Sequence, residues 1–128
     1  MKLSQLAKRV RISCTFGASL PWEKQDEWQR EANGYRVVIR YGRRQMTLDY
    51  WMGSAHTREP DAASVLSCLL SDADALQYSF EEWAANLGYD PDSRKAERIY
   101  QLCVRQGERL KRLLGDDFET FTQAENDI

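Results

Sequence analysis

The sequence predicts an α+β fold in which a small antiparallel β-sheet, made of an N-terminal strand and a hairpin, packs against three C-terminal helices. Two observations carry this prediction. Apolar residues alternate with polar ones in the first half of the 128-residue chain, and they recur at helical spacing in the second half. Strands followed by helices are typical of α+β proteins. We therefore predict a single domain over residues 1–128, with strands within about 9–51, helices within about 60–114 and a polar tail from about 122 to 128.

Three segments of the first half have the two-residue period of half-buried strands. Val10, Ile12, Cys14 and Phe16 alternate with polar residues and predict the first strand. The next two segments are residues 35–41, rich in β-branched and aromatic side chains, and residues 46–51. Because a short polar turn at 42–44 separates them, they predict a β-hairpin.

The connection over residues 17–34 is the least regular part of the sequence. It is predicted to contain a short helix capped by Ser19, with Pro21 in its first turn, and to end in a turn at Asn33-Gly34. Its large apolar side chains are Trp22 and Trp28. Tryptophans exposed on such a segment would mark an interface.

The first two predicted helices follow from apolar spacing and from their caps. Apolar residues between 65 and 73 recur at helical spacing, and Pro60 fits the first turn of that helix. Ser79-Phe80-Glu81-Glu82 is a capping box, which satisfies two backbone N–H groups at the start of a second, short helix. Trp83 and Leu87 give that helix an apolar face, and Gly88 ends it.

The third predicted helix is the longest. It begins after Asp90-Pro91-Asp92-Ser93 and runs to about Leu114, where Gly115 ends it in the left-handed αL conformation. Residues 116–121 are predicted to add one more turn.

Charge is distributed unevenly along the chain, although the formal net charge is −2. Residues 1–60 contain eleven Lys/Arg and six Asp/Glu, a net charge of +5, whereas residues 61–128 contain seven and fourteen, a net charge of −7. A near-neutral total argues against a protein that binds polyanions through a strongly basic domain.

Arginines gather in two places. A row of five follows one face of the longest helix: Arg94, Arg98, Arg105, Arg109 and Arg112. Four more lie in the hairpin beside Tyr35, Tyr41, Tyr50 and Trp51: Arg36, Arg40, Arg43 and Arg44. These residues predict either a surface that binds phosphates and stacks the bases of a single strand, or a solvated helix face and a hairpin whose aromatic residues pack in the core.

An acidic stretch lies between Arg58 and Arg94, where the sequence has no lysine or arginine. Asp61 fits a helix N-terminus, where the helix dipole favours negative charge. The residues predicted to bind a partner are Asp72, Asp74, Glu81, Glu82, Asp90 and Asp92. Such a patch suits a basic, nucleic-acid-handling surface on another protein; the alternative is solvation, or pairing with the arginine row.

The residues that could carry chemistry do not form a recognisable active site. Ser54 and His56 suggest a nucleophile and a base, but no third orienting residue can be assigned, so turn or capping chemistry is the favoured interpretation. The cysteines Cys14, Cys68 and Cys103 are too widely spaced for a zinc motif and suit a reducing compartment. We therefore predict a protein that is not an enzyme and that holds no metal and no cofactor.

Three sequence blocks resemble a family of small proteins encoded by bacteriophages and prophages. The blocks are Met52 to Thr57 with Glu59-Pro60 after it, Ser79 to Ala84, and Gly88 to Glu97. The resemblance covers about residues 35–120 and leaves out the N-terminal third. It implies an accessory protein that acts in the cytoplasm of the bacterial host. The sequence itself has no apolar run that predicts a signal peptide or a membrane span.

Small phage proteins of this kind include inhibitors of host defence, among them anti-CRISPR proteins. The resemblance therefore implies a phage-encoded inhibitor of a bacterial defence system, with an anti-CRISPR protein that binds a Cas effector and blocks nucleic-acid engagement as the leading hypothesis. The alternative is a phage nucleic-acid-binding accessory protein that uses the arginine residues.

Overall fold

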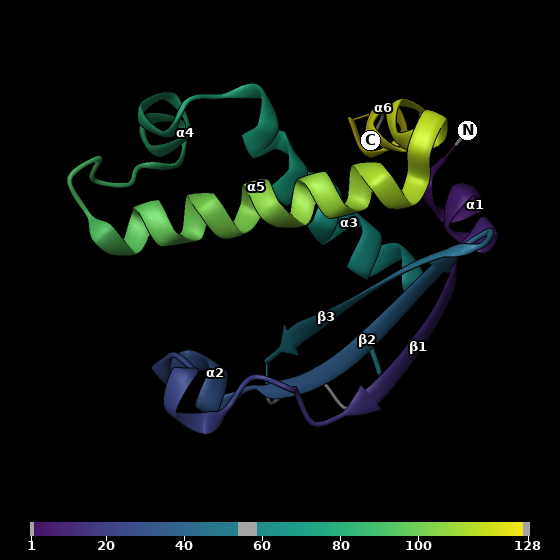
Figure 1. The fold of residues 1–128 in the computed structure, drawn as a ribbon, viewed down its shortest axis with the longest axis horizontal. Coiled ribbons are helices and arrows are strands. Elements are labelled where there is room, and N and C mark those ends of the chain that lie inside the picture. The colour runs from purple at the N-terminus through teal and green to yellow at the C-terminus, as the bar shows by residue number, and fades with distance from the viewer. Residues whose placement is uncertain (1, 54–58, 127–128) are drawn as a thin grey trace.

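The computed structural model describes residues 2–53 and 59–126, and Figure 1 shows how its elements are arranged. The strands are β1 (Arg11–Phe16), β2 (Asn33–Tyr41) and β3 (Arg44–Met52). The α-helices are α1 (Leu3–Leu6), α2 (Glu27–Glu31), α3 (Ala62–Ala73), α4 (Phe80–Leu87), α5 (Arg94–Leu114) and α6 (Phe118–Asn126). The 3-10 helices are η1 (Ala7–Arg9), η2 (Trp22–Lys24), η3 (Asp74–Gln77) and η4 (Gly115–Asp117). The predicted α+β fold class is confirmed.

The three strands form an antiparallel sheet in the order β1-β2-β3, so β3 is an edge strand. The register gives the sheet two different faces. On one face Val37 lies between Cys14 and Leu48, and on the other Arg36 lies between Thr15 and Asp49. Because alternate residues of a strand point to opposite faces, the first face is apolar and the second is polar.

The helices cover the apolar face of the sheet. In Figure 1, α3 and α5 cross that face, while α6 and α1 lie together near the hairpin end. The largest side chains of this core include Val37, Ile39, Leu66, Leu110 and Phe121, all essentially without exposed surface. Helix α4 packs on α5 through a second, smaller apolar cluster around Trp83.

The helix α3 crosses α5 very closely at Gly107. A Cβ atom at this glycine would lie 2.8 Å from the Cα atom of Ala73. Carbon atoms at van der Waals contact are about 3.5–4.0 Å apart, so no larger residue fits without movement of a helix. Gly107 therefore sets the distance between α3 and α5.

The helices at both ends of the chain go beyond what the sequence patterns predicted, which was a single turn over residues 116–121. The predicted polar tail from residue 122 is wrong, because α6 continues to Asn126 and buries Phe121 and Ala124. Residues 2–9, which carried no prediction, form α1 and η1 and bury Leu6 completely. These helices are short and contact each other. Because short helices are stabilised mainly by tertiary packing, the spacing of their apolar residues does not predict them from the sequence.

The connection between β1 and β2 differs from its prediction. Ser19 does not cap a helix, since its N–H and hydroxyl groups donate to Asp49 of β3 at 3.0 and 2.8 Å. The N-cap of α2 is Asp26, whose backbone N–H donates to the side chain of Gln29. Gly34 does not form a turn but lies inside β2 opposite Trp51, where a Cβ atom would collide with the indole ring.

Local capping signals were predicted more accurately. The capping box at Ser79 is confirmed, and Gly88 ends α4 with a φ of 77°. Ser93 caps α5, and Asp61 rather than Pro60 begins α3. Gly115 ends α5 at a φ of 57°, but its ψ of −129° lies outside the predicted αL region.

Two apolar residues predicted to be buried lie on the surface. Leu87 was assigned to the apolar face of α4, but 59% of it is exposed. Phe16, at the end of β1, is 71% exposed and touches Tyr35 with one ring edge. In both cases the element ends before the neighbouring layer can cover the side chain.

Candidate functional site, a cleft between strand β3 and helix α5

Two hollows follow one another along the line where β3 and α5 lie side by side, and Arg109 lines both. The first, which we call the basic groove, has a volume of about 460 Å³ and is bounded by Arg44 to Met46 and by Arg112. The second, the aromatic cavity, has a volume of about 570 Å³ and reaches Trp28 of α2. Together they form the β3–α5 cleft.

Arg109 joins the two elements of the cleft. One terminal nitrogen of its guanidinium donates to Oε1 of Gln106 at 2.9 Å, and the other donates to the backbone carbonyl of Thr47. Because β3 is an edge strand, some of its backbone groups have no strand partner. Arg109 supplies a donor to one of them, so this member of the arginine row points inward and has a structural role.

The basic groove brings together arginines from both predicted groups. The guanidinium of Arg44 donates to the backbone carbonyl of Arg112 at 3.1 Å, near the C-terminus of α5, where the helix dipole favours a cation. Arg40 donates to Gln45, which lines the groove. The hairpin tip is fixed here by Tyr41, whose hydroxyl donates to Asp117 and whose pKa that bond raises. Arg44 and Arg112, distant in the sequence, thus meet at the groove, and Arg40 approaches it from the other face of the sheet through Gln45.

The polar face of the sheet, on the other side of the edge strand β3 from the groove, carries further arginines. Arg11 and Arg40 are direct cross-strand neighbours, and like charges in that position repel each other. Arg36 lies opposite Asp49, but the carboxylate of Asp49 accepts hydrogen bonds from Ser19 and from the Leu20 N–H. The basic surface is defined by six exposed residues: Arg11, Arg36, Arg40, Arg43, Arg44 and Arg112.

The remaining arginines of the α5 row lie elsewhere. Arg94 and Arg98 border a separate hollow with Glu97 and Gln101 near the start of α5. Arg105 borders another, beside Glu108. Since a helix rises about 1.5 Å per residue, Arg94 and Arg112 are roughly 27 Å apart along the axis. The predicted row is therefore divided in space, and its C-terminal end is the part that meets the hairpin.

The aromatic cavity has walls of large apolar side chains that keep an exposed surface. The rings of Trp28 and Trp51 meet edge to face, with centroids 6.4 Å apart. Trp28 is 55% exposed and Leu102, on the facing side of α5, is 50% exposed. The sequence marked Trp28 as a candidate interface residue, and its exposure agrees with that. Leu102 was not singled out, because helical spacing does not show where a neighbouring element ends.

Tyrosines of the predicted stacking platform belong mainly to the core. Tyr35 is buried, Tyr41 packs on Phe121, and Tyr50 lies half-buried on the apolar face of the sheet. Core packing therefore accounts for them, as the alternative interpretation of the hairpin held. Trp51 is the platform residue that faces Trp28.

Several titratable groups lie in or beside the aromatic cavity. Burial raises the pKa of Asp72, while a hydrogen bond from the Cys103 thiol lowers it. Burial also raises the pKa of Cys103 to about 12 and that of Cys68, which keeps some exposed surface, to about 11. Both thiols are thus protonated at neutral pH, the form in which cysteine is a poor nucleophile.

The acidic residues predicted to bind a partner do not all lie together. Asp72 turns toward α5 and lines the aromatic cavity. The other five are exposed on η3, α4 and the turn before α5: Asp74, Glu81, Glu82, Asp90 and Asp92. Within residues 2–53 and 59–126, no ion pair joins any of the six to an arginine of α5. The acidic and basic surfaces therefore do not neutralise each other by direct contact.

Helix capping explains part of this acidity. Glu82 bonds with Ser79 in the capping box, Asp90 accepts from the backbone N–H of Asp92, and Asp74 accepts from Gln77. Glu81 lies in the first turn of α4. Carboxylates at these positions satisfy N–H groups or meet the positive end of a helix dipole.

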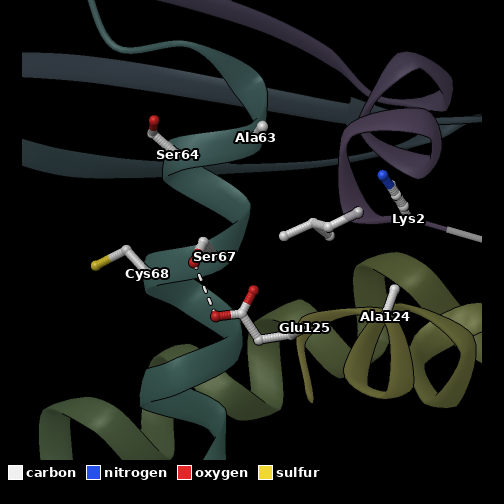
Figure 2. Close-up of a pocket in the computed structure, with 8 residues that line it drawn as sticks. Lys2, Ala63, Ser64, Ser67, Cys68, Ala124 and Glu125 are labelled. Atoms are coloured by element: carbon white, nitrogen blue, oxygen red, sulfur yellow. Dashed lines mark hydrogen bonds between the residues drawn. The ribbon is translucent and has the colours of Figure 1, made fainter. Parts of the chain in front are cut away.

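A third cavity, of about 770 Å³, lies between α1, α3 and α6 (Figure 2). Its polar side is formed by Glu125, which accepts a 2.8 Å hydrogen bond from the Ser67 hydroxyl, and Lys2 stands across from it. The second carboxylate oxygen of Glu125 is buried and has no hydrogen-bond partner among the residues described. Such an acceptor lowers stability, so this cavity marks a weak point in the packing of α6.

No protein-family model, no curated protein and no solved structure matches the chain. The phage family suggested by the three sequence blocks therefore stays a prediction. Ser54 and His56 lie outside the described residues. Among the residues that are described, no three His, Cys, Asp or Glu side chains gather to hold a metal ion, and no helix is both long and apolar enough to cross a membrane.

Proposed function

We propose that the chain binds nucleic acid by its phosphate backbone, at the basic surface that runs from the polar face of the sheet into the basic groove. One observation carries the proposal: arginines of β2, β3 and α5, far apart in sequence, lie around the edge strand β3, on both sides of it. Arg40 contacts Gln45 of the groove, and Arg44 contacts Arg112 across it. Arginine side chains bind phosphate oxygens with paired, charge-assisted hydrogen bonds.

The charges of this surface are only partly offset within the protein, by Asp49 opposite Arg36. Arg11 and Arg40 face each other across β1 and β2, which costs free energy through repulsion. None of the six arginines of the basic surface forms an ion pair in the part of the chain that the structure describes. A bound polyanion relieves this repulsion and releases counterions, which is the usual driving force for nucleic-acid binding.

Binding of a fluorescein-labelled 20-nucleotide single strand, followed by anisotropy at several salt concentrations, tests the proposal. Replacing Arg40 and Arg112 by glutamine should weaken binding at least tenfold in low salt. It should also reduce the slope of log affinity against log salt by about 1.4, since each phosphate contact on a single strand contributes about 0.7.

The matched control replaces Arg94 and Arg98 by glutamine. These residues belong to the same sequence row and change the net charge equally, but they lie at the other end of α5. The control should lose less than threefold in affinity. Equal losses in both double variants, or binding that does not depend on salt, would contradict the proposal.

A second candidate function is the leading hypothesis from the sequence, a phage inhibitor that binds a Cas effector and blocks its nucleic-acid channel. The observation that favours it is the group of exposed carboxylates on η3, α4 and the turn before α5, none of which pairs with an arginine of α5 within the described residues. Acidic surfaces associate with basic channels by charge complementarity.

Co-purification with Cas effectors and phage plaque assays test this second candidate. Changing Glu81, Asp90 and Asp92 to lysine should abolish the complex and the protection of the phage, whereas the Arg40 and Arg112 variant should keep both. A chain that forms no complex with any effector and protects no phage is not such an inhibitor.

A further inference from the structure

The aromatic cavity continues the basic groove along the same two elements. Residues 44–46 of β3 border the groove and residues 47–51 border the cavity, while the bordering residues of α5 run from 113 back to 102. Arg109 belongs to both. A strand whose phosphates lie at the groove therefore has its next base within reach of the cavity.

The walls of the cavity suit a flat ring. Trp28 and Trp51 line it from α2 and β3 with their indole rings, and Leu102 lines it from α5 with an aliphatic side chain. Trp28 and Leu102 are each about half exposed, 55% and 50%. Covering them with a base removes apolar surface from water, and base stacking on aromatic side chains tolerates any sequence.

Two polar side chains of the cavity, Gln106 and Asp72, can provide one hydrogen-bond donor and one acceptor to a ligand. The Oε1 atom of Gln106 accepts from Arg109, so the amide nitrogen of Gln106 remains as the donor. The Asp72 carboxylate supplies the acceptor. Every nucleobase carries a hydrogen-bond donor next to an acceptor on its pairing edge, and that edge is free only when the base is unpaired.

We propose that the aromatic cavity takes one unpaired nucleobase, stacked between the tryptophans and Leu102, with its pairing edge on Asp72 and Gln106. This inference rests on the proposed nucleic-acid binding for its biological setting, but it makes a separate claim. It predicts that the protein binds single strands in preference to duplexes, because the pairing edge of a paired base is already occupied.

The first test compares a single-stranded 12-nucleotide oligonucleotide with an abasic strand of the same length and with a duplex. The normal strand should bind about tenfold more tightly than either of the others. Asp72→Ala and Leu102→Ser should each reduce this preference to about twofold, while Asp74→Ala, which removes an exposed carboxylate two residues further along the chain in η3, should leave it unchanged. Circular dichroism of each variant checks that it is folded.

The second test uses free nucleosides, which carry no phosphate. In an NMR titration, the indole N–H signals of Trp28 and Trp51 should shift, and that of Trp83 should not, because Trp83 belongs to α4 and is buried against α5. Equal binding of normal and abasic strands, together with unshifted indole signals, overturns the base-binding inference and leaves phosphate binding in place. Shifts with nucleosides but no oligonucleotide binding overturn the proposed function instead.

Discussion

The two ends of the β3–α5 cleft are built from the same two elements but are held in place differently. At the basic groove, Arg44 and Arg109 are fixed by hydrogen bonds to backbone carbonyls of α5 and β3. At the aromatic cavity, Trp28 and Trp51 are fixed by ring packing, with Gly34 leaving room behind the second ring. A hydrogen bond is lost when its donor side chain is removed. The packing of aromatic rings is instead disturbed when the volume of a neighbouring side chain changes.

This difference predicts which substitutions affect one end and which affect both. Residues that set the position of α5 support the whole cleft. Residues that contact one hollow alone should affect that hollow and leave the other intact. The following predictions are ordered from the largest expected effect to the smallest.

The largest effect is expected from Gly107→Ala, which should disturb both ends. The added methyl group would lie 2.8 Å from the Ala73 backbone, so α5 must move away from α3. Because the obstacle is a backbone atom, the overpacking cost should lie at or above the upper end of the usual range of about 1–3 kcal/mol, so that a net loss of about 2 kcal/mol or more remains after the roughly 1 kcal/mol that alanine gains over glycine in a helix. Urea denaturation measures the loss, with Gln101→Ala at an exposed position of α5 as the control. An unchanged midpoint would show that the crossing is not tight.

Arg109→Met should destabilise the protein by about 2 kcal/mol, because it leaves the Thr47 carbonyl and the Gln106 amide without their donor. Nucleic-acid affinity should fall at the same time, since this residue borders both hollows. Arg109→Lys should restore less than half of the stability, because an ammonium group does not span the two acceptors as a guanidinium does. Full rescue by lysine would mean that charge alone matters at this position.

Gly34→Ala should act at the aromatic end and cost about 1–2 kcal/mol, because the methyl group displaces the Trp51 ring. Near-ultraviolet circular dichroism and tryptophan fluorescence should change with it. The salt dependence of oligonucleotide binding should stay as in the wild type, since no arginine of the basic surface moves. A changed salt slope would show that the two ends are coupled.

Asp72→Asn should make the protein more stable at neutral pH. Burial raises the pKa of Asp72 in the folded state above its ordinary value of 3.8, so the folded protein holds this proton more tightly than the unfolded chain. Its contribution to stability therefore falls as pH rises through that window and is unfavourable above it. The gain in Tm of the variant over the wild type should be present at pH 7 and disappear below about pH 4. A constant difference at all pH values would contradict this reasoning.

Features decided by a few neighbouring residues could be predicted from the sequence. The capping box at Ser79 and the glycine end of α4 at Gly88 depend on hydrogen bonds within one turn of helix. The hairpin follows from alternation and its turn, and its register places Val37, Ile39 and Leu48 in the core. In these cases the interactions that stabilise the structure are made between residues that are close in the sequence, so the sequence pattern shows them.

Features decided by contacts between distant elements could not. The sequence row of arginines shows neither that Arg109 turns inward nor that Arg112 meets Arg44, since both depend on where α5 crosses β3. Asp72 was grouped with the acidic stretch by its position in the chain, although α3 turns it toward the cleft. Helix α1 was missed, and of α6 only a turn to residue 121 was predicted, because each helix is stabilised by contact with the other.

The hydrogen bond from Arg109 to the Thr47 carbonyl also bears on how copies of this protein behave at high concentration. An edge strand with free backbone groups is a template on which a strand from another molecule can add, and such addition leads to aggregation. The guanidinium occupies one acceptor of β3, and its charge opposes the approach of a second basic hairpin. Arg109, which joins the two elements of the cleft, thus also protects the β3 edge of the sheet against the addition of strands from other molecules.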